Sequence, residues 1–247
     1  KSILAIGTGG GFTALCMAKA LTDFKIPGTI YTIDRVGHDE KILRFYQLPT
    51  DEKPHEDKIS NKEIWNSVAP SEWTDKIVTL QGYSGVVLDK PIFKNIDFCY
   101  IDGNHAYEGV KHDFFSLLKI SSNSFSVLFD DYMDRDFYGV KEFIDKEVDT
   151  HFLLKLIKTD VNEDMKKFSR IEHDYGMVYL NYASKSPAIK NYDLHEVNTF
   201  LEKYRKNDSR IRSTRYDIEK KIPFLKNIKF KFWKNYKWNK RNFKKLI

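Results

Sequence analysis

Short apolar runs alternate with amphipathic stretches from Ser2 to about Asn181. The apolar runs predict seven strands, over Ile3–Gly7, Thr29–Asp34, Ile77–Gln81, Ile96–Asp102, Ser126–Asp130, Leu153–Thr159 and Met177–Asn181. The stretches between them predict helices over Phe12–Leu21, Asn61–Val68, Tyr107–Leu118 and Tyr138–Val148. Alternating strands and helices are typical of a parallel sheet covered on both faces. We therefore predict an α/β fold with a doubly wound, mostly parallel seven-stranded sheet.

The remaining segments predict additions to this sheet. The last two strands follow each other without an intervening helix, so we expect an antiparallel pair at the sheet edge. Residues 36–60 are polar, contain Pro49 and Pro54, and predict an insertion over one end of the sheet. Helical patterns near Leu194–Lys206 and Arg210–Lys221 follow. We predict a domain over 1–183, a C-terminal helical extension over 184–221 and a tail over 222–247.

The distribution of charge sets the tail apart from the rest of the chain. The chain has 41 Lys and Arg against 35 Asp and Glu, a net charge of +6. Residues 220–247 contain eleven of the basic residues and no acidic one, which leaves 30 basic and 35 acidic groups in the first 219 residues. Interleaved aromatic residues allow three interpretations: packing on the body or on another subunit, binding to an anionic membrane, or stacking on single-stranded nucleic acid. We predict the membrane and expect no nucleic-acid partner.

Apolar runs and cysteines bear on the cellular compartment. No run of about 18 apolar residues and no signal-like leader is visible. Because the chain starts at Lys1, directly before an apolar run, we expect that an N-terminal portion is missing. Cys16 and Cys99 each lie in an apolar stretch, and we expect both to be reduced core residues. The prediction is a cytoplasmic protein, with peripheral membrane contact through its tail.

A glycine-rich loop follows the first predicted strand. Gly7, Thr8, Gly9 and Gly11 lead into a helix, where glycine permits positive φ and the helix N-terminus offers free N–H groups. Asp34 ends the second strand, where a carboxylate can accept both hydroxyl hydrogens of a ribose. Together they predict an adenosine-containing cofactor; the alternative is a tight turn and a surface aspartate. The loop alone does not separate S-adenosylmethionine (SAM) from a nicotinamide dinucleotide.

Three aspartates follow two later strands. Asp102 ends the fourth strand, and Asp130 and Asp131 end the fifth. The carboxyl ends of neighbouring parallel strands meet at one edge, so these carboxylates can converge on a hard cation such as Mg²⁺. Consecutive side chains on a strand point to opposite faces, so Asp130 and Asp131 can share an ion only if the strand has already turned. The alternative is helix capping by Asp102 and turn formation by the other two.

These motifs together resemble a known family. The runs GTGGGFTAL, IDGNHAYEGVKHD and FDDY are similar to those of SAM-dependent methyltransferases of the cephalosporin-hydroxylase-like and macrocin O-methyltransferase-like type, over about residues 2–181. The resemblance implies a Rossmann-like fold in which the glycine loop and Asp34 bind SAM. It also implies that Asp102, Asp130 and Asp131 hold Mg²⁺.

The chain departs from the family's pattern at three places. Ala5 stands where an acid usually contributes to SAM binding. Asn104 stands where the macrocin-type branch often has an aspartate that serves as the base. After the third strand the usual Gly-Asp-Ser reads Gly82-Tyr83-Ser84, so we expect the adenine to meet Tyr83, with Ser84 beside it.

A histidine is the remaining candidate for the base. An amide such as Asn104 cannot take a proton, whereas the imidazole of His105 titrates near neutral pH and lies on the same loop. The alternative for His105 is a cap or a core hydrogen bond at the start of the following helix. His112 and Asp113 are expected on the faces of that helix, and His38, His55, His151, His173 and His195 are assigned to no site.

We predict a SAM-dependent O-methyltransferase with Asp102 and His105 as catalytic residues. It would transfer the methyl group of SAM to a hydroxyl of a sugar-like or polyol acceptor, with Mg²⁺ or another divalent cation chelating the acceptor oxygen. The alternatives are a nicotinamide-dependent oxidoreductase and a non-catalytic or nucleic-acid-binding relative of the fold. The expected partners are a small-molecule or glycan acceptor, and a homo-oligomer is compatible with the sequence.

Overall fold

The structure is a computed structural model that describes residues 1–46, 52–133, 138–148, 154–158, 176–182 and 195–207. The chain divides into two units, Lys1–Leu201 and Glu202–Ile247. The first unit contains the sheet, and residues 195–201 at its end are helical, as are the described residues 202–207 of the second. The predicted helix over 210–221 and the basic tail lie outside the described residues. None of the described helices is both long enough and apolar enough to cross a membrane.

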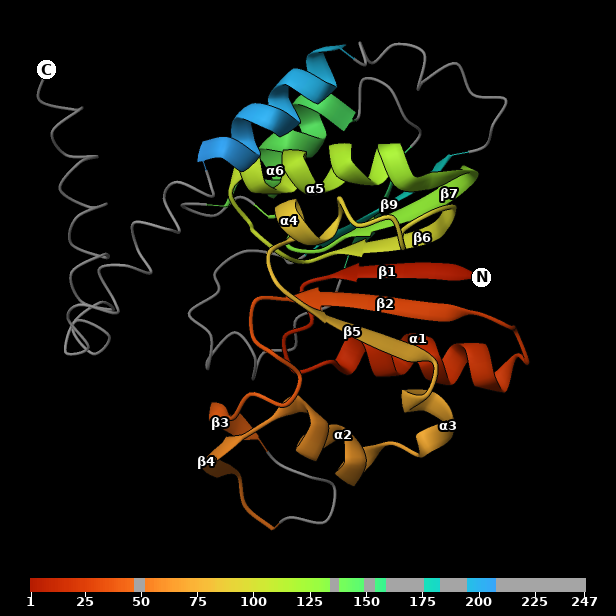
Figure 1. The fold of residues 1–247 in the computed structure, drawn as a ribbon, viewed down its shortest axis with the longest axis vertical. Helices are drawn as coiled ribbons and strands as arrows, with labels where there is room; N and C mark the ends of the chain where they lie inside the picture. The colour runs from red at the N-terminus through yellow and green to blue at the C-terminus, as the bar shows by residue number, and fades with distance from the viewer. Residues whose placement is uncertain (47–51, 134–137, 149–153, 159–175, 183–194, 208–247) are drawn as a thin grey trace, which may run out of the picture. The chain divides into compact units, whose positions relative to one another are not determined.

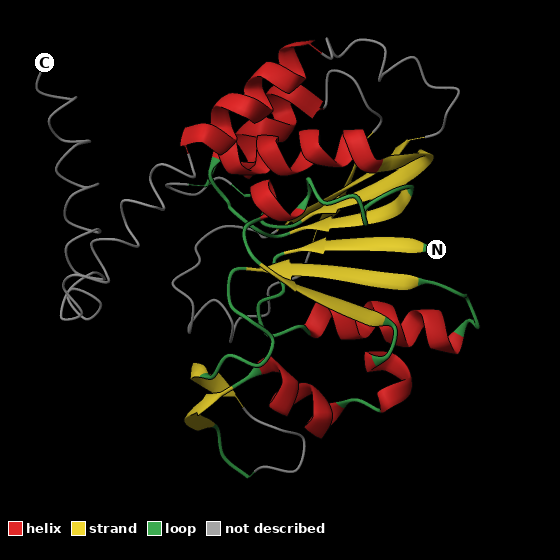
Figure 2. Cartoon of the chain, viewed as in Figure 1, coloured by secondary structure: helices red, strands yellow, loops and turns green. Residues whose placement is uncertain are grey.

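The predicted seven-stranded sheet is confirmed. Its strands are β1 (Ser2–Ile6), β2 (Thr29–Asp34), β5 (Ile77–Gln81), β6 (Ile96–Ile101), β7 (Ser121–Phe129), β8 (Leu154–Lys158) and β9 (Gly176–Tyr182), in the order β5-β2-β1-β6-β7-β9-β8. The strands from β5 to β7 are parallel, and β9 runs antiparallel to both of its neighbours. Figure 2 shows the strands of the sheet fanned out between helices on either side. The chain reverses its direction of progress between β1 and β6, which is where ligands bind in such sheets.

Helices cover both faces of the sheet. Figure 1 shows α1 (Phe12–Asp23) and α3 (Ser71–Thr74) on one face, with α4 (Ser84–Val87), α5 (Tyr107–Ile120) and α6 (Val140–Phe143) on the other. The helix predicted over 138–148 is α6 followed by a π-helical turn over Ile144–Val148. A right-handed crossover places a helix on one face after each parallel strand, so the order of elements itself requires this layering.

The polar segment over 36–60 contains a hairpin that the sequence pattern did not predict. Its strands are β3 (Ile42–Tyr46) and β4 (His55–Ile59), which pair antiparallel apart from the main sheet. The helix α2 (Asn61–Val68) follows directly. Its start is fixed by a capping box, in which Ser60 accepts from the Glu63 backbone amide and Glu63 accepts from that of Ser60.

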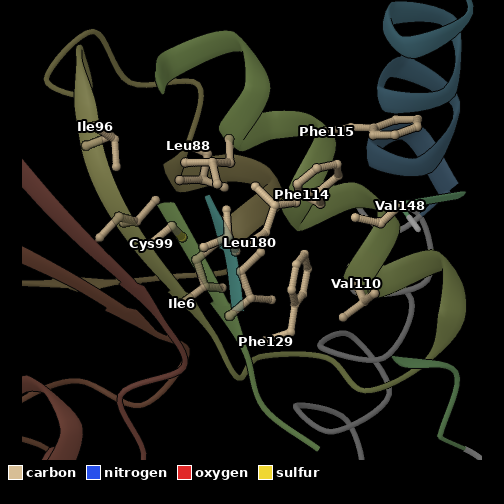
Figure 3. Packing of buried hydrophobic residues seen from close by; sticks show 14 of the residues in the cluster. Ile6, Leu88, Ile96, Cys99, Val110, Phe114, Phe115, Phe129, Val148 and Leu180 are labelled. Atoms are coloured by element: carbon tan, nitrogen blue, oxygen red, sulfur yellow. The ribbon is translucent and has the colours of Figure 1, made fainter. Parts of the chain in front are cut away.

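The larger core lies between the sheet and α5. Figure 3 shows Phe114 and Phe129 facing each other across this layer, with ring centroids 5.6 Å apart. Leu180 from β9 and Ile6 from β1 lie in the same cluster, so the antiparallel edge and the centre of the sheet share one core. The packing holds the carboxyl ends of β1, β6 and β7 in a fixed arrangement, and the candidate site is built on these ends.

The prediction that both cysteines are core residues is half wrong. Cys99 is buried in β6, but Cys16 is exposed on α1. The buried residues of α1 are Ala14, Ala18 and Leu21, spaced by four and three positions. Because a helix turns 100° per residue, Cys16 lies about 200° around the axis from Ala14 and faces away from the sheet.

Candidate active site

The loop after β1 needs glycine, because its backbone adopts positive φ angles and lies close to neighbouring atoms. Gly7, Gly9 and Gly11 have φ of 95°, 53° and 86°, a region that other residues avoid. A Cβ atom on Gly7 would lie 2.0 Å from the carbonyl oxygen of Asp102, because the ends of β1 and β6 adjoin. The loop therefore presents bare backbone beside the residue that ends β6.

Asp34 organises this loop from the end of β2. Its Oδ2 accepts from the backbone amides of Thr8 and Gly9, at 3.2 and 3.0 Å, and its Oδ1 accepts from that of Val36 at 2.9 Å. The hydroxyl of Thr8 also lies 2.7 Å from that of Thr32 on β2. The structure thus brings the predicted cofactor residues of the first loop together with the predicted ribose-binding acid.

Helix α2 holds the outer side of the same loop. The Asn61 side-chain amide donates to the Gly9 carbonyl at 3.0 Å, and the Trp65 indole donates to the Gly10 carbonyl at 2.9 Å. The Trp65 ring is buried and lies so close to Gly11 that a Cβ there would come within 2.2 Å of it. Two loop carbonyls are therefore fixed by a helix more than 50 residues away in sequence.

A small pocket opens beside Asp34, with room for about one water molecule. It lies at the carboxyl ends of β2 and β5 and includes residues of the segment between them. Its lining residues are Thr8, Asp34, Val36, His38, Asn61, Thr79 and Leu80.

The loop after β5 is tied to α5 by a buried carboxylate. Ser84 donates to Oδ1 of Asp113 at 2.5 Å, and the His112 ring nitrogen Nδ1 lies 3.0 Å from the same oxygen. His112 and Asp113 are fully buried in α5, so they support this loop from within. Tyr83, predicted to meet the adenine, is 37% exposed beside this anchor. The assignment of Tyr83 and Ser84 to the cofactor stays a prediction.

Two carboxylates converge on His105 where β6 and β7 end. The Nε2 atom of His105 lies 3.3 Å from Oδ1 of Asp102, and its Nδ1 lies 3.0 Å from Oδ2 of Asp131. One ligand atom from each residue lies within 4.8 Å of the other two, close enough to share a metal ion. Two of the three residues are predicted metal ligands, and the third is the predicted base.

The electrostatics of this cluster follow from its contacts. Hydrogen bonds to Asp102 and Asp131 raise the pKa of His105 to about 10, against the opposing effect of burial. Burial is the main cause that raises the pKa of Asp102, and the charges of Asp130 and Asp131 add to it. The imidazolium thus occupies the position where a cation would balance two carboxylates.

Asp130 has a different environment from its neighbour. Its Oδ2 accepts from the Tyr100 hydroxyl, and its Oδ1 accepts from the backbone amide of Asp131 at 2.8 Å. β7 ends at Phe129, and Asp131 has a φ of 56°, so the backbone turns sharply directly after the strand. After the turn, the Asp131 carboxylate contacts His105, whereas the Asp130 carboxylate contacts the Tyr100 hydroxyl. Asp130 as a metal ligand stays a prediction.

The structure also shows the surroundings of Asn104 and Ala5, the two other positions that depart from the family's pattern. Asn104 accepts from the backbone amide of Ala106 at 3.1 Å, a local turn at the start of α5. Ala5 is buried in β1 and pairs in register with Tyr100 of β6. Tyr100, whose hydroxyl donates to Asp130, is therefore the neighbour on β6 of Ala5, the position where an acid was expected.

Sequence reasoning missed four residues around the site, namely His38, Asn61, Trp65 and Tyr100. Asn61 and Trp65 were visible only as parts of a helix. No spacing rule could join them to a glycine loop on the other side of an insertion. Tyr100 lay within an apolar strand run, where an aromatic residue carries no functional signal.

The sheet order, the glycine loop after β1 and the acid after β2 define the Rossmann-like class of nucleotide-cofactor proteins to which class I methyltransferases belong. A family described as "Methyltransferase domain" matches residues 4–132, slightly more than half of the chain. The chain belongs to this methyltransferase family. No curated protein matches it significantly.

Solved structures with similar folds include three enzymes. One is the O-methyltransferase TomG from Streptomyces achromogenes in complex with SAM, with 19% identity, coverage of 74% of this chain and 73% of that chain, and a TM-score of 0.46. Another is a putative caffeoyl-CoA O-methyltransferase from Staphylococcus aureus, with 14% identity, coverage of 73% and 76%, and a TM-score of 0.46. The third is spermidine synthase from Thermotoga maritima, with 13% identity, coverage of 81% and 58%, and a TM-score of 0.45.

Family membership and the site support methyl transfer with SAM as the cofactor. The loop has bare backbone at Gly9 and Gly10, where an added Cβ would point into open space, and it lies beside the Asp34 carboxylate and the small pocket. These features fit an adenosine-containing ligand.

Proposed function

We propose that the protein is a SAM-dependent O-methyltransferase that acts on a hydroxyl of a sugar-like or polyol acceptor with the help of a divalent cation. The observation that carries the proposal is the cluster of Asp102, His105 and Asp131 beside the glycine loop. Transfer to a hydroxyl needs a group that removes its proton and a positive charge that stabilises the developing oxyanion. This cluster has residues for both tasks next to the cofactor loop.

Asp102 and Asp131 would hold the cation, because carboxylate oxygens suit Mg²⁺ or Mn²⁺. When bound, the cation supplies Lewis acidity toward the acceptor hydroxyl. Asp102 is tied through its backbone to the end of β1, directly before the cofactor loop, since its amide donates to the Ile6 carbonyl at 2.9 Å. The tie would keep the acceptor hydroxyl close to the methyl donor.

His105 is the proposed base. Its two carboxylate partners raise its pKa to about 10, so the imidazole keeps its proton at neutral pH while both partners face it. It can accept a proton from the acceptor once those carboxylates are engaged elsewhere, because they cause the rise in its pKa. The backbone carbonyl of His105 accepts from Gly139 at 2.7 Å, and the Tyr138 ring lies 4.7 Å from the imidazole. The hydrogen bond fixes the backbone at His105, and the Tyr138 ring packs against the imidazole.

The test is a calorimetric titration of the full chain with Mn²⁺, followed by methyl-transfer assays over a panel of sugars and polyols. Asp131→Asn should lose metal binding and the metal response of turnover. Asp23→Asn, at the far end of α1, is the matched control and should change neither. Full turnover in excess chelator would contradict the role of the cation, and methylation of amines in place of hydroxyls would contradict the acceptor class.

The alternative of a nicotinamide-dependent oxidoreductase is disfavoured by family membership. A competition between SAM and NAD for the purified chain tests it directly. Tighter binding of NAD would overturn the methyltransferase assignment.

We also propose that residues 222–247 hold the enzyme on an anionic membrane surface. The support is the charge of the sequence, since eleven basic residues and no acidic one occur over 220–247. Each Lys or Arg near such a surface contributes about 1 kcal/mol. Acceptors attached to lipid would be concentrated there.

A further inference from the structure

The pocket beside Asp34 is lined by buried polar atoms for which the described residues provide no hydrogen-bond partner. Among the residues that the structure describes, the buried Nδ1 of His38 and Oδ1 of Asn61 have no hydrogen-bond partner. Both residues line the pocket together with Asp34. Buried polar atoms are almost always paired in native proteins, so this pocket is built to receive a polar group.

The unpaired oxygen of Asn61 belongs to an almost fully buried side chain. The residue is only 2% exposed, and its side-chain Nδ2 donates to the Gly9 carbonyl at 3.0 Å. That hydrogen bond fixes which end of the amide faces the loop. The remaining oxygen can only accept, so the pocket lacks a donor.

Asp34 cannot supply every acceptor that a ribose needs. A ribose presents two neighbouring hydroxyls, and each has one hydrogen to donate. The Asp34 carboxylate already accepts from three backbone amides, those of Thr8, Gly9 and Val36. A carboxylate has about four acceptor positions, which leaves about one for a ligand. A second acceptor is therefore required beside Asp34.

We propose that Asn61 is this second acceptor, so that one ribose hydroxyl of the cofactor donates to Asp34 and the other enters the pocket and donates to Asn61. The pocket has room for about one water molecule, which a hydroxyl can replace without moving the backbone. Nδ1 of His38 offers a further contact to the same hydroxyl. Burial lowers the pKa of His38, so its neutral ring is favoured there. The inference rests on the proposed use of SAM.

The competing explanation is that Asn61 only anchors the glycine loop. Trp65 provides the matched control, because it also donates to a loop carbonyl, that of Gly10, but does not line the pocket. Trp65→Phe removes this donor and keeps most of the ring packing. Asn61→Ala removes the corresponding donor and the pocket acceptor together.

The experiment measures binding of S-adenosylhomocysteine and of its 2′-deoxy and 3′-deoxy analogues to the full chain by calorimetry. Wild type should prefer S-adenosylhomocysteine over each analogue by about tenfold or more, since each lost hydroxyl leaves an acceptor unpaired. Asn61→Ala should bind S-adenosylhomocysteine about tenfold more weakly and lose the preference over one of the two analogues. Trp65→Phe should weaken all three ligands by the same factor and keep both preferences.

Folding is followed for every variant by thermal unfolding without ligand. Asn61→Ser is measured alongside Asn61→Ala, so that a folded variant without the amide oxygen is available. If the Asn61 variants keep both preferences and lose affinity equally for all three ligands, Asn61 is only an anchor and the inference is wrong. If wild type binds none of the three ligands, the cofactor assignment itself fails, which is a separate result.

Discussion

Replacing Asp34 with alanine tests whether this residue supports the protein as well as its ligand. In a role confined to ribose binding, Asp34→Ala would cost cofactor affinity alone. In the structure, however, the backbone amides of Thr8, Gly9 and Val36 all donate to Asp34. The substitution would remove their acceptor even in the ligand-free protein. We therefore expect the ligand-free protein to lose stability.

The magnitude follows from these contacts. Hydrogen bonds to charged groups contribute about 1.5–3 kcal/mol each. The hydrogen bond from Gly9 is exposed and the other two are part-buried, so in the variant water can hydrogen-bond to the freed amides and recover part of the lost energy. We therefore count about 1 kcal/mol per bond. The expected fall in the free energy of unfolding is about 2–3 kcal/mol, or roughly 4–12 °C in Tm for a chain of this size.

The assay is urea unfolding of the ligand-free protein, extrapolated linearly to water. Asp39→Ala is the matched control, because the Asp39 side chain is 73% exposed and forms a surface ion pair with Lys62. Such pairs contribute about 0–1 kcal/mol. If Asp34→Ala unfolds within about 0.5 kcal/mol of wild type while losing SAM binding, the contacts to the loop contribute nothing to stability and our reasoning is refuted.

Three further predictions concern the loop, the histidine cluster and the tail. Gly11→Ala should destabilise the protein by several kcal/mol, about 3 or more, because the added Cβ would lie 2.2 Å from the Trp65 ring and φ is 86°; thermal unfolding near that of wild type would contradict this. In excess chelator, the pKa of His105 is about 10 when folded and 6.5 when unfolded, so its stabilisation is complete below pH 6.5 and is lost as pH rises to 10. Wild type should accordingly lose stability over this range relative to His105→Gln, and parallel pH profiles of unfolding would show that the cluster contributes nothing. Removal of residues 223–247 should leave turnover on a soluble acceptor nearly unchanged and weaken salt-sensitive binding to acidic liposomes; unfolding of the truncated chain would favour packing of the tail instead.

The strands and the glycine loop could be predicted from the sequence because their signals are local. The periods of two and 3.6 residues fix which runs become strands and helices, and they gave all seven strands of the sheet. The glycines after β1 were identified because only glycine tolerates the backbone that such a loop needs, and Gly7, Gly9 and Gly11 have positive φ as expected. The hairpin of β3 and β4 was missed, because β3 alternates only between half-buried and exposed positions and four of the five residues of β4 are exposed, so neither strand has a buried face that would mark it.

The grouping of side chains was decided by the tertiary structure. The sequence places Asp102, Asp130 and Asp131 at neighbouring strand ends, and the folded chain brings Asp102 and Asp131 to His105 and Asp130 to the Tyr100 hydroxyl. The contact between Asn61 and Gly9 joins positions 52 residues apart, and it exists because the insertion packs back onto the loop. Local sequence determines which residues reach the edge of the sheet. Where each side chain points beyond the end of its strand depends on backbone angles and packing that only the folded chain specifies.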